Sequence, residues 1–167
     1  TILKVIKVLT PHISPEFGAK SVETFYLLLL GLIQAGGLQL ELFPPAKQES
    51  ILAKFGDMLL EALSILKATF DANPSPALLQ LLTIPVLDIL CKPVPALQTL
   101  AVEMYLALLQ TEYSSTGAIR EVSRGTIDHL DALVAVEGDL LAATFLPRVQ
   151  AVFDAGDAEL QRQGAAF

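Results

Sequence analysis

Two histidines and a single cysteine are the side chains of this sequence best suited to metal binding or catalysis. His129 lies in the segment Ile127-Asp128-His129-Leu130-Asp131, where carboxylates flank an imidazole on both sides. Ligands that share one helix face are three or four residues apart, whereas His129 directly follows Asp128 and precedes Asp131 by two positions. We therefore expect His129 to be exposed to solvent rather than to bind a metal.

The other candidate reactive groups have simpler interpretations. His12 falls in a turn and is expected at the surface. Cys91 has Lys92 as its neighbouring cation, so burial as a small apolar side chain is favoured over a reactive thiol. The Ser114-Ser115-Thr116 segment could be phosphorylated, but it also suits the cap of a helix that begins at Ala118.

The sequence lacks the short motifs that accompany common enzyme chemistry. It contains no phosphate-binding glycine loop, no nucleophile elbow and no spacing of zinc ligands. We therefore expect that the protein is not an enzyme and that it holds no cofactor or metal.

Charged side chains near the end of the sequence offer a different kind of site. Between positions 128 and 159 the acids outnumber a single basic residue, Arg148. If they converge in space, they could attract a basic segment of a partner protein, although solvated turns and helix caps would also explain them. These candidate residues are Asp128, Asp131, Glu137, Asp139, Asp154, Asp157 and Glu159.

Arg120 and Arg124 are the candidate basic contacts. They are four residues apart and could receive an acid from a partner, but Arg124 could equally neutralise Glu121 or Asp128.

Composition limits the kinds of partner. The net charge of −7 disfavours nucleic acid, because phosphate recognition depends on Lys and Arg. The apolar run from Phe25 to Gln34 is far shorter than the roughly 20 residues that span a bilayer. With one cysteine, no disulfide can form within the chain, which fits an intracellular protein in the cytoplasm or nucleus. We expect protein partners, no direct contact with nucleic acid and no membrane span.

Apolar residues recur at helical spacing throughout, and no useful stretch alternates as a strand would. The protein is predicted to be all-α, with Pro85 kinking or splitting its helix near Thr83. The expected helices span residues 1–10, 15–34, 46–72, 76 to about 91, 95–112 and 118–134, with one more ending at Phe153.

An internal repeat appears when Pro15 is superposed on Pro95, an offset of 80 residues. Phe25 then aligns with Tyr105, and the pair Leu28-Leu29 aligns with Leu108-Leu109. Two units of about 40 residues lie within the range of HEAT and armadillo repeats. Because a lone helical hairpin cannot bury both apolar faces, stacked hairpins would explain the 53% hydrophobic content.

These residues resemble a HEAT-type repeat. Ile84-Pro85-Val86-Leu87 and Leu146-Pro147-Arg148-Val149 look like its first helix, and Ala101 looks like a small packing position in its second. The sequence departs from the pattern at Leu97-Gln98-Thr99, where a basic residue is expected. The resemblance implies an α-solenoid of stacked antiparallel helical hairpins, in one repeat domain over residues 1–167 with about four hairpins, as a fragment of a longer array.

The function predicted on this basis is a protein-interaction scaffold or adaptor, as a subunit of a larger complex. This step rests on fold-level analogy, because helical arrays mostly bind proteins. The alternative is a compact helical bundle that binds a lipid or another apolar ligand.

Overall fold

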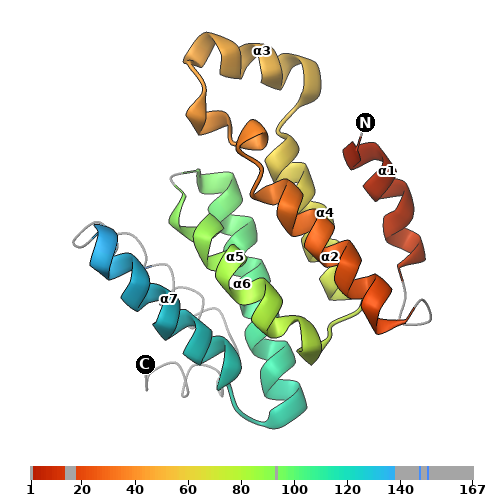
Figure 1. Ribbon diagram of the computed structural model, residues 1–167, viewed down its shortest axis with the longest axis vertical. Helices are drawn as coiled ribbons and strands as arrows, with labels where there is room; N and C mark the ends of the chain where they lie inside the picture. The colour runs from red at the N-terminus through yellow and green to blue at the C-terminus, as the bar shows by residue number, and fades with distance from the viewer. Residues whose placement is uncertain (1, 14–17, 93, 138–146, 148–149, 151–167) are drawn as a thin grey trace. The chain divides into compact units, whose positions relative to one another are not determined.

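A computed structural model describes residues 2–13, 18–92, 94–137, 147 and 150 of the chain. These residues form helices and turns, and none of them lies in a strand (Figure 1). The predicted all-α fold class, a segment of a helical-repeat protein, is therefore confirmed. The structure divides into two compact units, Thr1–Asn73 and Pro74–Phe167, and each is described by itself. A single repeat domain of about four hairpins over residues 1–167 stays a prediction.

The first unit is built on α4 (Met58–Ala72), which packs against both α1 (Ile2–Leu9) and α2 (Ala19–Ile33) (Figure 1). Leu3 and Ile6 are the buried residues of α1, as expected for one face of a short amphipathic helix. Short 3-10 turns lie at Thr10–His12, Gly36–Leu38 and Leu40–Leu42. The buried apolar residues of the two longer helices are Phe25, Tyr26, Leu29, Leu30, Ile33, Leu59, Ala62, Leu63, Ile65, Leu66 and Phe70.

The single helix predicted over residues 46–72 is wrong, because the chain breaks at Gly56. Helix α3 (Pro45–Phe55) ends there, and Gly56 adopts a positive φ of 71°, which glycine tolerates best because it has no Cβ atom. The next residue, Asp57, caps α4 by accepting a hydrogen bond from the Leu60 N–H at 2.9 Å. Apolar periodicity alone missed this break, although Gly followed by Asp is a stop-and-start signal.

The second unit is an α5–α6 hairpin with α7 packed on it. Helix α5 (Leu79–Cys91) is followed closely by α6 (Pro95–Thr116), and α7 (Glu121–Glu137) lies against both (Figure 1). A 3-10 turn at Pro76–Leu78 leads into α5. The core of this unit contains Leu82, Val86, Leu87, Leu90, Leu97, Ala101, Met104, Tyr105, Leu108, Leu109 and Val122, each at most 2% exposed.

Three boundaries in the second unit differ from the prediction. Helix α5 continues through Pro85, so the chain is not split near Thr83. Helix α6 extends to Thr116 instead of ending near Glu112, and α7 begins at Glu121 rather than at Ala118. Ser114-Ser115-Thr116 therefore forms the last turn of α6 and does not cap the next helix. The predicted helix ending at Phe153 lies outside the described residues, except for Pro147 and Gln150.

The internal repeat holds at some positions and fails at another. Phe25 and Tyr105 are both buried, as are Leu29 and Leu109. Leu28 is 52% exposed, whereas the residue aligned with it, Leu108, is fully buried. The proposed counterpart of Pro95, Pro15, lies outside the described residues. Helices α2 and α6 thus share one buried stripe, but α6 is buried around more of its circumference.

Candidate functional site

Helix α7 carries the part of the predicted acidic surface that the structure describes. Asp128 and Asp131 are both exposed, and because they are three residues apart they lie on the same side of the helix. Glu137 belongs to α7, but its side chain is not described. The other acidic candidates, Asp139, Asp154, Asp157 and Glu159, lie outside the described residues. The structure therefore brings two of the seven together, and convergence of the whole set stays a prediction.

The two candidate arginines differ in their surroundings. Arg124 Nη2 lies 2.6 Å from Glu121 Oε2, one turn earlier on α7, so this arginine already has an acidic neighbour. Arg120 precedes the helix and its side chain is exposed. A role for either in binding a partner stays a prediction.

The buried carboxylate of Glu112 holds the beginning of α7 against α6. Its side chain accepts hydrogen bonds from the backbone N–H groups of Arg120, Glu121 and Val122, at 2.7, 2.5 and 2.9 Å. The residue is 2% exposed. The first N–H groups of a helix have no partner within it, and they carry partial positive charge, so a carboxylate suits this position. Glu112 therefore acts as the cap of α7 from a neighbouring helix.

The sequence did not predict this cap, because Glu112 precedes the N–H groups that it binds by eight residues or more, whereas local capping motifs span about three residues. A signal was nevertheless present. Glu112 follows Tyr105 by seven residues and Leu108 by four, which places an acid on the buried stripe of α6. A carboxylate on such a stripe must find donors, because an unpaired buried charge is very costly.

Two further polar contacts join α7 to its neighbours. The Tyr105 and Thr126 hydroxyls lie 2.8 Å apart in the core, and Thr126 also donates to the Val122 carbonyl at 2.7 Å. His129 Nε2 lies 3.1 Å from Asp88 Oδ1 on α5, a distance that allows an ion pair when the imidazole is protonated. The expectation of an exposed His129 is wrong, since its side chain is only 11% exposed. Its partner is 41 positions away in the sequence, beyond the reach of local spacing rules.

The ionisation of Tyr105 gives a testable pH dependence. Burial raises the pKa of its hydroxyl from 10.0 to about 12, with a smaller contribution in the same direction from the Glu112 carboxylate and an opposing one from the Thr126 hydrogen bond. Because the raised pKa favours the protonated folded form, this stabilisation is complete below about pH 10 and is lost between about pH 10 and 12. We expect tyrosinate absorbance and loss of helical circular dichroism to rise together in that window.

The Tyr105→Phe variant is the control for this titration. It has no ionisable group at that position, so its alkaline unfolding should begin at higher pH than in the unmodified protein. An unchanged unfolding pH would contradict the assignment. Burial also raises the pKa of Tyr26, which remains as a second contribution in both proteins.

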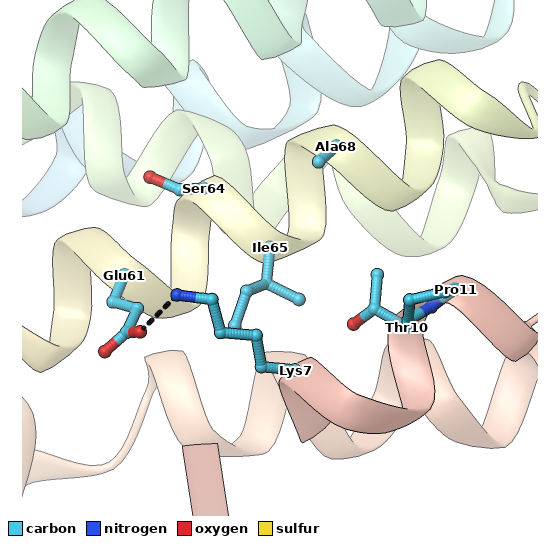
Figure 2. A pocket seen from close by; sticks show the side chains of 7 residues that line it. All are labelled: Lys7, Thr10, Pro11, Glu61, Ser64, Ile65 and Ala68. Carbon is cyan, nitrogen blue, oxygen red and sulfur yellow. Dashed lines mark hydrogen bonds and ion pairs between the residues drawn. The ribbon is translucent and has the colours of Figure 1, made fainter. Parts of the chain in front are cut away.

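In the first unit, a shallow pocket of about 290 Å³ lies between α1 and α4 (Figure 2). Lys7 extends along one side of it to Glu61, with Nζ 3.1 Å from Oε1. The hydroxyls in its lining bond to carbonyls of their own helices, Thr10 to Ile6 and Ser64 to Leu60. Few polar groups remain to orient a ligand in this pocket. The full set of lining residues is Lys7, Thr10, Pro11, Glu61, Ser64, Ile65 and Ala68.

The remaining sequence candidates offer no chemical site. His12 is exposed in a turn, as predicted, and Cys91 is partly buried near the end of α5. Within the described part of the chain, no group of three or more His, Cys, Asp or Glu side chains is arranged to hold a metal ion. No helix among the described residues is both long enough and apolar enough to cross a bilayer.

Comparison with known proteins shows the family to which the sequence belongs. The profile of the family described as "Dedicator of cytokinesis (DOCK) TPR region" matches residues 1–140, a span that contains every helix from α1 to α7. The chain belongs to the DOCK TPR-region family. The predicted helical-repeat character is thereby confirmed, although the resemblance in the sequence was to the HEAT and armadillo types and not to this family.

Two curated relatives agree with the assignment to the DOCK TPR region. The human and the mouse proteins named Dedicator of cytokinesis protein 4 are each 26% identical to this chain over 129 residues. The match covers 74% of this chain but 6% of each relative, so the chain spans a small part of their length. No solved structure matches the chain.

Proposed function

We propose that this DOCK TPR region is a protein-binding scaffold, a segment of a larger intracellular protein that works in a complex. The observation that carries this proposal is the family match over residues 1–140, in a chain that spans 6% of its DOCK relatives. HEAT or armadillo geometry for the repeats is part of the same proposal. Repeat arrays present extended helical surfaces, and such surfaces are suited to binding proteins.

We also propose that the region binds rather than catalyses. Three of its buried polar side chains are engaged in structural contacts: Glu112 with backbone N–H groups, and Thr69 and Thr83 with carbonyls of the preceding helical turn. The exposed acids Asp128 and Asp131 would attract a basic segment of a partner. The alternative of a bound lipid has less support, because the pocket of about 290 Å³ between α1 and α4 is at the small end for ligand sites.

Native mass spectrometry of the polypeptide isolated from its own cells tests the scaffold role. We expect a stoichiometric complex with at least one other protein, without retained lipid. The paired variant Asp128→Lys with Asp131→Lys should weaken that complex if the acidic face contributes. A polypeptide recovered alone, or with lipid in place of protein, would contradict the proposal.

A further inference from the structure

We draw no further inference here: the strongest candidate, the exposed apolar stripe of Ile2, Val5 and Leu9 beside the buried face of α1, carries nothing because nothing in the structure shows what covers it.

Discussion

Replacing Glu112 by alanine should lower the free energy of unfolding by roughly 3 kcal/mol. The substitution removes the acceptor of three backbone N–H groups at the start of α7. Each hydrogen bond to a charged group contributes about 1.5–3 kcal/mol, but water entering the vacated space would satisfy part of what is lost. The expected total is therefore smaller than the sum of three such bonds. Urea denaturation followed by far-ultraviolet circular dichroism measures it.

Two further variants show whether the loss of stability in Glu112→Ala comes from the lost cap of α7 or only from the removal of a negative charge. Glu112→Gln keeps one carbonyl oxygen but brings an N–H₂ group toward backbone donors. We therefore expect it to lower the free energy of unfolding, but by less than Glu112→Ala does. Asp131→Asn removes an exposed charge from α7 and should change stability by less than about 0.5 kcal/mol. If Glu112→Ala were as stable as Asp131→Asn, the carboxylate would not hold α7.

Tyr105→Asp should prevent the second unit from folding. The side chain is fully buried in α6, so the substitution leaves a cavity and puts a carboxylate in an apolar core. Its cost of roughly 5 kcal/mol or more approaches the whole stability of a typical domain, which is about 5–15 kcal/mol. We expect loss of helical circular dichroism and of a cooperative thermal transition.

The conservative substitution at the same position shows how much of that loss is due to the ring. Tyr105→Phe keeps the ring and removes one hydrogen bond to Thr126, which still donates to the Val122 carbonyl. The expected loss is about 1 kcal/mol. An unchanged melting temperature in Tyr105→Asp would mean that Tyr105 does not lie in the core.

The spacing of apolar residues in the sequence correctly predicted which side chains of α6 are buried. Tyr105 and Leu109 lie on a regular apolar stripe, and both are buried. Ala101 was expected at a close packing position and is also fully buried. Helix boundaries were less predictable. Apolar residues continue at helical spacing across Gly56, so the spacing did not indicate that a helix ends there, where the glycine has a positive φ.

Contacts between distant parts of the sequence could not be predicted in this way. Glu112 caps a helix that follows it, and His129 meets an acid on α5, so both depend on how α5, α6 and α7 pack. The exposure of helix α3 was missed for a related reason. Leu52 and Phe55 belong to an apolar stripe, and such stripes are usually buried, whereas here both side chains are exposed.

Amide hydrogen exchange resolved by residue is the most direct test of the central claim, which is that the packed helices carry the stability while α3 remains uncovered. In the isolated chain we expect amides of α5 and α6 to exchange most slowly. Amides of α3 should exchange at least roughly a hundredfold faster, because helices without buried contacts open locally at low cost. Equal protection of α3 and α6 would contradict the account, since it would mean that α3 is covered as well as α6 is.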